Sequence, residues 1–278
     1  MGKAEKTRES WQERRTKIRH KWAVLFFFAE WICEQVSYFL GRWAFLDILG
    51  HIGRLTILIA VITYFLGADE RRMQAEDQRK AKHYQAWQVI NIAQGKPGGG
   101  GRLDALQDLN SDGISLAYVD ASEAWLPGLN LENATLYRAN LAGATLGVAN
   151  LSAANLHSAN LTGADLNQAN LAGANLVWAN LTKAGLPAAD LSSANLTNAD
   201  VAEANLAWAR LDGANLKDIR NWQSIRLEDA YIRDVKNAPD GFTTWAKDAK
   251  AVTSGSLKEW EQEKKKWLEK EREAEEGR

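Results

Sequence analysis

Residues 134–166 have the sequence ATLYRANLAGATLGVANLSAANLHSANLTGADL. A leucine recurs here at every fifth position, and the residue two places before each leucine is always alanine. The residue between them is usually Asn or Asp. A period of five fits neither the 3.6-residue period of a helix nor the two-residue period of a strand. This stretch therefore predicts a solenoid whose coil contains a multiple of five residues.

The same period extends over about one hundred residues. A leucine stands at every fifth position from Leu116 to Leu216, with Ala121 and Val201 as the two substitutes. We expect the alanine and the leucine of each unit to point inward and the Asn or Asp to point outward, while the two variable residues form a turn. Stacked coils then place leucine on leucine and pair each short strand with the strands above and below.

This A-(N/D)-L-x-x unit resembles the repeat of the pentapeptide-repeat family. The resemblance implies a mainly β solenoid, a right-handed quadrilateral β-helix with four repeats in each coil. About five coils follow from the number of repeats, and at ~4.8 Å per coil the rod is roughly 25 Å long. After Leu216 the pattern continues at Trp222, Leu227 and Ile232 with one six-residue step, which predicts an irregular last coil.

Both ends of a solenoid need caps, because unpaired strands would otherwise template aggregation. Residues 102–109 (RLDALQDL) predict a helix over the N-terminal end, so that the capped β-helix spans residues 102–235. Residues 236–278 then form a C-terminal cap, with Phe242 and Trp245 as lid residues, and a charged helix.

The charged helix begins near Leu257 and carries one apolar stripe. This stripe predicts either a dimer seam, and hence a homo-oligomer, or a helix that frays in solvent. The stripe consists of Leu257, Trp260, Trp267 and Leu268.

The sequence before the repeat predicts a membrane anchor. Residues 1–21 form a basic leader, and two mostly apolar runs follow within residues 22–66. Each run approaches the ~20 residues that a spanning helix requires. The connection near Gly41 is very short, and no signal-peptide cleavage site follows the first run. We expect a transmembrane helical hairpin, with a single span preceded by an interfacial helix as the alternative.

The positive-inside rule orients this hairpin. The basic leader and Arg71 with Arg72 after the second run both favour the cytoplasmic side. The expected location is a membrane, such as the bacterial inner membrane, crossed more than once, with the lipid bilayer as a partner and the repeat domain in the cytoplasm. Residues 67–94 then form a charged helical stalk, and the glycine-rich residues 95–101 form a flexible joint.

Five ionisable residues interrupt the apolar runs. Glu30 and Glu34 lie one helical turn apart, and Asp47, His51 and Arg54 follow a similar spacing. Ionisable groups in a membrane are costly and point at one another or at water. One hypothesis is an ion path through an oligomer. The favoured one is pairing of acids with bases, because two helices alone do not enclose a pore.

No set of residues predicts catalysis or a cofactor. Cys33 is the single cysteine, which excludes an intrachain disulfide framework. Asp108, Asn110 and Asp112 resemble the start of an EF-hand calcium loop, but Val119 stands where the loop needs a glutamate, so a turn is the favoured interpretation. Because no nucleophile, base and orienting group form a recognisable set, we expect a non-enzyme without a metal or cofactor.

The variable positions of the repeat predict a partner-binding surface. Tyr137, His157 and Val177 are twenty residues apart, so four-repeat coils stack them, and Tyr118 and Trp178 fall in the neighbouring column. These five residues predict an exposed aromatic ridge. Aromatic side chains scattered over the rod are the alternative interpretation.

The favoured function is a non-catalytic, membrane-tethered scaffold whose rigid surface binds an unidentified protein. The resemblance adds an alternative, since some family members resemble duplex DNA and inhibit or protect type II topoisomerases. Duplex DNA carries about one charge per 1.7 Å, so a rod of roughly 25 Å would need on the order of fifteen acids. Residues 116–216 contain only eight acidic and three basic residues, which argues against mimicry of DNA. The positive and negative charges of the whole chain are nearly balanced, which argues against nucleic acid as a partner. An oligomeric ion-conducting membrane protein is the third hypothesis.

Overall fold

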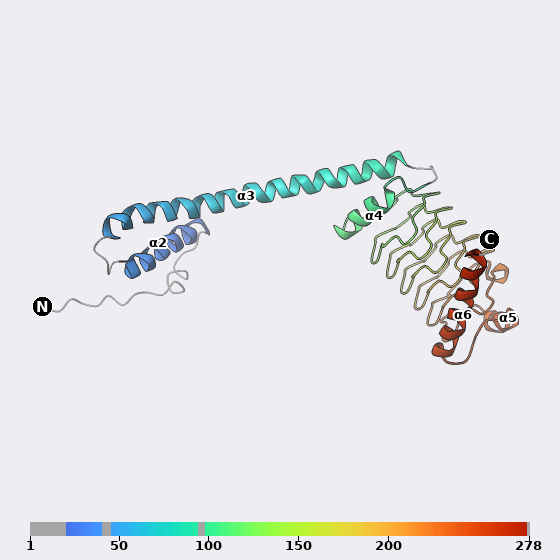
Figure 1. The fold of residues 1–278 in the computed structure, drawn as a ribbon. Coiled ribbons are helices and arrows are strands. Elements are labelled where there is room, and N and C mark those ends of the chain that lie inside the picture. The colour runs from blue at the N-terminus through green and yellow to red at the C-terminus, as the bar shows by residue number, and fades with distance from the viewer. Residues whose placement is uncertain (1–20, 41–45, 94–97, 277–278) are drawn as a thin grey trace. The chain divides into compact units, whose positions relative to one another are not determined.

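A computed structural model of the chain describes residues 21–40, 46–93 and 98–276 (Figure 1). The chain forms two compact units, residues 1–80 and residues 81–278, which divide within a long helix. The first unit contains the helix α2 (Lys21–Leu40) and most of α3 (Leu46–Ile92).

The helices of the first unit do not meet the requirements of a membrane span. Among the described residues, no helix is both long enough and apolar enough to cross a bilayer. The physical reason is that Glu30 and Glu34 lie in the middle of α2, while the uncharged part of α3, residues 55–68, is short of the ~20 residues required. The predicted location in a membrane is therefore wrong, and the transmembrane hairpin has no support.

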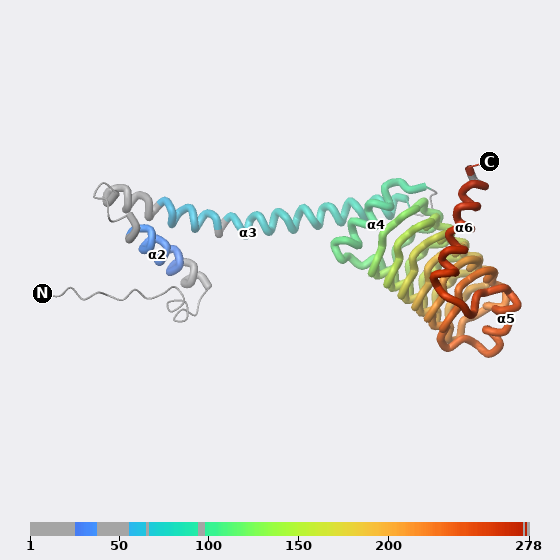
Figure 2. The backbone as a smooth tube through the Cα atoms, turned by 60° about the horizontal axis from the view of Figure 1, so that its bottom comes forward, coloured from blue at the N-terminus to red at the C-terminus, as the bar shows by residue number. Residues whose placement is uncertain are grey.

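The second unit is a β-helix whose coil contains twenty residues. Isolated parallel bridges join each residue at the Asn/Asp position to the residue twenty places later, from Asp120 with Asn140 to Asp200 with Arg220. Figure 2 shows these coils as successive, nearly parallel rungs. Four five-residue repeats per coil are therefore confirmed.

The backbone of one repeat shows how the coils are held together. We number the repeat from its leucine, so that positions 2 and 3 form the turn, position 4 is alanine and position 5 is Asn or Asp. The amide of Ala139 donates to Leu136 O at 3.0 Å and closes the turn. The amides of Leu136 and Arg138 donate to the next coil at 2.9 Å each, and Asn140 donates to the preceding coil at 2.8 Å. Repetition of these bonds in each five-residue repeat joins the backbones of successive coils along the whole solenoid.

The interior is filled by positions 1 and 4. From Leu116 to Leu216, every residue at these two positions is at most 3% exposed. Position 5 lies at the surface and forms ladders, in which Asn150 Nδ2 donates to Asn130 Oδ1 at 3.1 Å and Asn170 Nδ2 donates to Asn150 Oδ1 at 3.2 Å. The same Asn oxygens accept a position 2 amide of their own turn, as Asn170 Oδ1 does from Ala172. The asparagines therefore stabilise both the turn and the stack.

One extra residue ends the regular register. The short helix η1 (Trp222–Ser224) accommodates it, and the later bridges, such as Asn205 with Arg226, join residues 21 places apart. Leu227 and Ile232 are buried as expected, while Trp222 is half-buried at position 1 and Ile225 is buried at position 4 of the same repeat. Trp222 also packs edge to face against the C-terminal cap.

Helices cover both ends of the solenoid. At the N-terminal end, α4 (Arg102–Ser111) and the last turns of α3 bury the apolar side chains of Ile90, Leu106 and Leu109 against the first coil. At the other end, α5 (Phe242–Asp248) buries Phe242, whose ring lies 5.5 Å from that of Trp222. The edge of the first coil is also paired, because Gly98 bridges to Ala124.

The turns are strained at position 3. From residue 118 to residue 218 the backbone φ at this position lies between +52° and +70°, and only five of these residues are glycine. A left-handed conformation costs an L-residue roughly 1–2 kcal/mol. Val148 has φ +59°, and its side chain is 64% exposed, so little burial compensates this β-branched residue.

We therefore expect Val148→Gly to stabilise the solenoid. The relief of strain exceeds the entropic cost of glycine, which is ~0.5–1 kcal/mol, and leaves a gain on the order of 0.5–1 kcal/mol in the free energy of unfolding. Urea denaturation measures this change. Gly163→Val is the matched control, because a Cβ at Gly163 meets no atom within 4 Å and φ is +65° there, so strain alone should destabilise it. If Val148→Gly and Gly163→Val were both as stable as the native protein, backbone strain at position 3 would be contradicted.

Candidate protein-binding surface

The side chains at positions 2 and 3 form columns along the outside of the solenoid, because each coil repeats after twenty residues. Two adjacent columns contain the aromatic ridge, which consists of Tyr118, Tyr137, His157, Val177 and Trp178. Tyr118 is 64% exposed and Trp178 is 51% exposed.

The first three residues of the aromatic ridge form a continuous stack. The ring of Tyr118 meets that of Tyr137 edge to face, with centroids 5.5 Å apart, and the rings of Tyr137 and His157 are 5.4 Å apart. The guanidinium of Arg138 lies 5.4 Å from the centre of the Tyr137 ring, and Ser158 Oγ lies 2.9 Å from His157 Nδ1. The structure therefore brings together side chains that the sequence placed in adjacent columns.

The ridge continues with a different kind of contact. Val177 is half-buried, and Trp178 is covered by Arg220, whose guanidinium lies 5.7 Å from the centre of the indole. Arg220 also donates from Nε to Asn198 O at 3.1 Å and pairs with Asp200 at 3.8 Å. Sequence reasoning missed Arg138 and Arg220. Arg138 directly follows Tyr137 in the sequence. Arg220 belongs to the repeat two coils after that of Trp178, so only knowledge of the coil length could have predicted that the two side chains are close.

A second aromatic cluster lies under the C-terminal helix α6 (Leu257–Glu276). Trp260 is 5% exposed, its Nε1 donates to Asp229 O at 2.7 Å, and its ring lies 5.4 Å from that of Tyr231. The ring of Trp267 stacks on that of Trp208 with centroids 5.7 Å apart. The stripe predicted as a dimer seam or a fraying helix thus packs on the solenoid of its own chain.

Lys264 connects the middle of α6 to the solenoid through a hydrogen bond. Its Nζ donates to Ala188 O at 2.6 Å and lies 5.1 Å from the centre of the Trp260 ring. Burial lowers the pKa of Lys264, while Asp190 and Glu261 oppose this change and Arg210 adds to it.

This pKa predicts how α6 responds to pH. An unfolded lysine keeps its proton up to its ordinary pKa of 10.5, whereas folded Lys264 releases it earlier. The unfolded state therefore binds more protons in this interval, and stability rises with pH. We expect the native protein to gain stability relative to Lys264→Met as the pH approaches 10.5. Urea denaturation of both proteins at several pH values measures the difference, and a difference that does not change with pH would contradict the burial of the charge.

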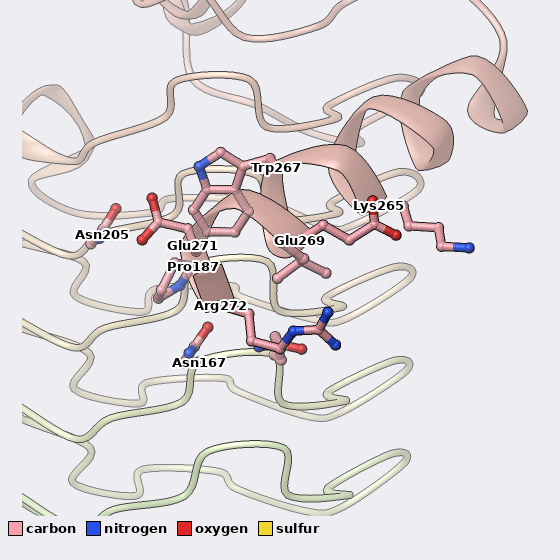
Figure 3. A pocket seen from close by; sticks show the side chains of 10 residues that line it. Asn167, Pro187, Asn205, Lys265, Trp267, Glu269, Glu271 and Arg272 are labelled. Atoms are coloured by element: carbon pink, nitrogen blue, oxygen red, sulfur yellow. The ribbon is translucent and has the colours of Figure 1, made fainter. Parts of the chain in front are cut away.

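A groove of about 660 Å³ separates the C-terminal half of α6 from the solenoid (Figure 3). No His, Cys, Ser or Thr is among the residues that line it. Its lining residues are Asn167, Gln168, Pro187, Asn205, Lys265, Trp267, Leu268, Glu269, Glu271 and Arg272.

The carboxylates that resembled a calcium loop are engaged in ion pairs. Asp108 pairs with Lys82 at 3.2 Å, and Asp112 lies 2.7 Å from His83 Nε2. These contacts join the end of α3 to α4. Within the described parts of the chain, no three His, Cys, Asp or Glu side chains are grouped so that they could hold a metal ion.

The ionisable residues of the apolar runs do not form a described site. Glu30 is exposed on α2, and Glu34 is half-buried. The side chains of Asp47, His51 and Arg54 lie outside the described residues, as do the basic leader and the connection near Gly41.

Comparison with known proteins identifies the repeat. Residues 114–147, 149–185 and 189–220 match the family model described as pentapeptide repeats, in eight copies. The solenoid is therefore a pentapeptide-repeat β-helix, as the resemblance implied. No curated protein matches the sequence.

Similar solved structures are also pentapeptide-repeat or resistance proteins. HetL, a pentapeptide-repeat protein involved in heterocyst differentiation regulation from the cyanobacterium Nostoc sp. strain PCC 7120, is 30% identical over 47% of this chain and 66% of HetL, with a TM-score of 0.25. Rfr23 from the cyanobacterium Cyanothece 51142 is 27% identical over 46% of this chain and 58% of Rfr23, with a TM-score of 0.23.

QnrB1, a plasmid-mediated fluoroquinolone resistance protein, is 17% identical over 45% of this chain and 71% of QnrB1, with a TM-score of 0.24. The matches span less than two thirds of HetL and of Rfr23. Because all three TM-scores are low, the assignment rests on the family match and the coil geometry.

Proposed function

We propose that this chain is a non-catalytic pentapeptide-repeat protein whose aromatic ridge binds another protein. The observation that carries this proposal is the stack of Tyr118, Tyr137 and His157 on the outside of a regularly bonded solenoid. Tyr, Trp and Arg are the residues that contribute most to protein interfaces. The ridge contains Tyr and Trp and has Arg138 and Arg220 beside it, which supports a binding function.

The rigidity of the solenoid supports the same proposal. Every turn of the ridge column is bonded to the next coil, as Arg138 N is to His157 O at 2.9 Å. A side chain held in place before binding loses less conformational freedom in the complex. The interior of the solenoid is filled by leucine and alanine, so it leaves the outer surface as the place for recognition.

The charge distribution does not favour DNA mimicry. Four of the eight acidic residues between Leu116 and Leu216 lie in ion pairs. A DNA-like surface requires a dense row of uncompensated negative charges. The paired acids are Asp190 and Asp212 with Arg210, Asp200 with Arg220, and Glu203 with Lys183.

Photo-crosslinking in cells tests the proposed function. We expect benzoyl-phenylalanine at Tyr137 or at Trp178 to capture one discrete protein, because both positions lie on the ridge. Ala153 is the matched control, since it is an exposed turn residue in another column of the solenoid. Mass spectrometry identifies the captured protein. Equal capture from Ala153, or none from either ridge position, would argue against the ridge as a binding surface.

A further inference from the structure

One backbone carbonyl oxygen in every repeat takes no part in the hydrogen bonds between the coils. From Thr135 to Lys217, the carbonyl oxygens at positions 1, 2, 4 and 5 accept backbone amides, as those of Leu136, Tyr137, Ala139 and Asn140 do. The carbonyl oxygen at position 3, the left-handed residue, accepts no backbone hydrogen bond in any repeat from residue 118 to residue 218. The solenoid therefore carries columns of free acceptors on its outside.

Three side chains that pack on the outside of the solenoid use such acceptors. Trp260 Nε1 donates to the position 3 carbonyl of Asp229, and Lys264 Nζ donates to that of Ala188. Arg220 Nε donates to that of Asn198. An unpaired carbonyl binds an N–H donor wherever one comes close, so these contacts show the chemistry by which this surface holds a side chain.

Each of these donors also contacts an aromatic ring. Trp260 packs against Tyr231, Lys264 lies over Trp260, and Arg220 lies over Trp178. The helix α6 combines both contacts along one stripe, in which Trp260 and Lys264 are one helical turn apart. The two donors meet carbonyls two coils apart, because Ala188, Trp208 and Asp229 hold equivalent places in three successive coils. The helix α6 is thus an internal example of a ligand of this surface.

The aromatic ridge has the same two elements without a helix on it. Tyr118 and Trp178 are exposed and Tyr137 and His157 are half-buried, and the position 3 carbonyls of Tyr118, Arg138 and Ser158 accept no hydrogen bond within the described chain. The charge differs from that under α6. Lys264 has Asp190 nearby, whereas the ridge carries Arg138 beside Tyr137. A fitting ligand therefore presents a neutral N–H donor and a carboxylate.

We infer that the aromatic ridge binds a tryptophan-bearing amphipathic helix of a partner protein, whose indole N–H groups donate to the free position 3 carbonyls and whose acidic residues face Arg138. This inference rests on the proposed function, and it adds the chemistry of the partner. The helix α6 itself has this pattern, because Glu263 and Glu271 lie one turn before and one turn after Trp267.

A peptide of residues 256–276, labelled with fluorescein and titrated with the full chain, is the probe. We expect saturable binding by fluorescence anisotropy. The double variant Tyr118→Ala, Tyr137→Ala should bind at least tenfold more weakly, because the ring stack is lost. Trp125→Ala is the matched control and should bind normally, since Trp125 is an exposed aromatic residue outside the ridge. Circular dichroism of each variant verifies that the solenoid remains folded.

A second peptide tests the hydrogen bonds. Benzothienylalanine in place of both tryptophans keeps the ring shape and removes the N–H group, and we expect several-fold weaker binding. Equal affinity of the two peptides, or absence of saturation, would overturn the inference. Binding that is lost in Trp208→Ala but kept in the ridge double variant would also overturn it. Capture of a protein at Tyr137 by crosslinking, together with a peptide that does not bind, would refute the helix while the proposed function stands.

Discussion

The structure depends on the pairing of each residue with the residue twenty places later. Once the coil closes after four repeats, equal positions stack, and one small apolar set, alanine and leucine, fills the interior in layers. The same register aligns the asparagines into ladders, in which an amide such as that of Asn150 serves the coil on either side. Because all these contacts share one period, a change of one residue in coil length displaces every one of them together.

The chain uses such a displacement to end the solenoid. One added residue near η1 shifts the later bridges to 21 places, and Trp222, at position 1 of the next repeat, is only half-buried. The indole then joins Phe242 and Trp245 in an aromatic cluster on the last coil. The irregularity therefore supplies apolar surface to the cap at the place where the strand edge would otherwise lie open.

The sequence predicted those features that depend on its period. The inward positions follow from spacing alone, whereas the four-repeat coil, and with it the alignment of Tyr137 with His157, followed from the resemblance to the pentapeptide-repeat family. The membrane location predicted from the N-terminal runs is wrong, because Glu30 and Glu34, which were interpreted as groups that pair within a membrane, make the first run too polar for a span. The stripe of α6 was recognised, but its partners were not. Trp208 and Tyr231 are distant in sequence, and a stripe does not tell which surface covers it.

The position that strains the backbone also carries several aromatic side chains at the surface of the solenoid. Glycine fits a left-handed residue best, yet Tyr118, Trp178 and Trp208 all occupy position 3 with φ between +58° and +62°. Each of these three aromatic side chains has a ring or cation partner: Tyr137, Arg220 and Trp267 respectively. Strain of this kind persists where surrounding contacts offset it, and it concentrates at functional sites. The left-handed turn directs a side chain outward and leaves its own carbonyl free, so the most costly residue of each repeat is the one best placed to meet another helix.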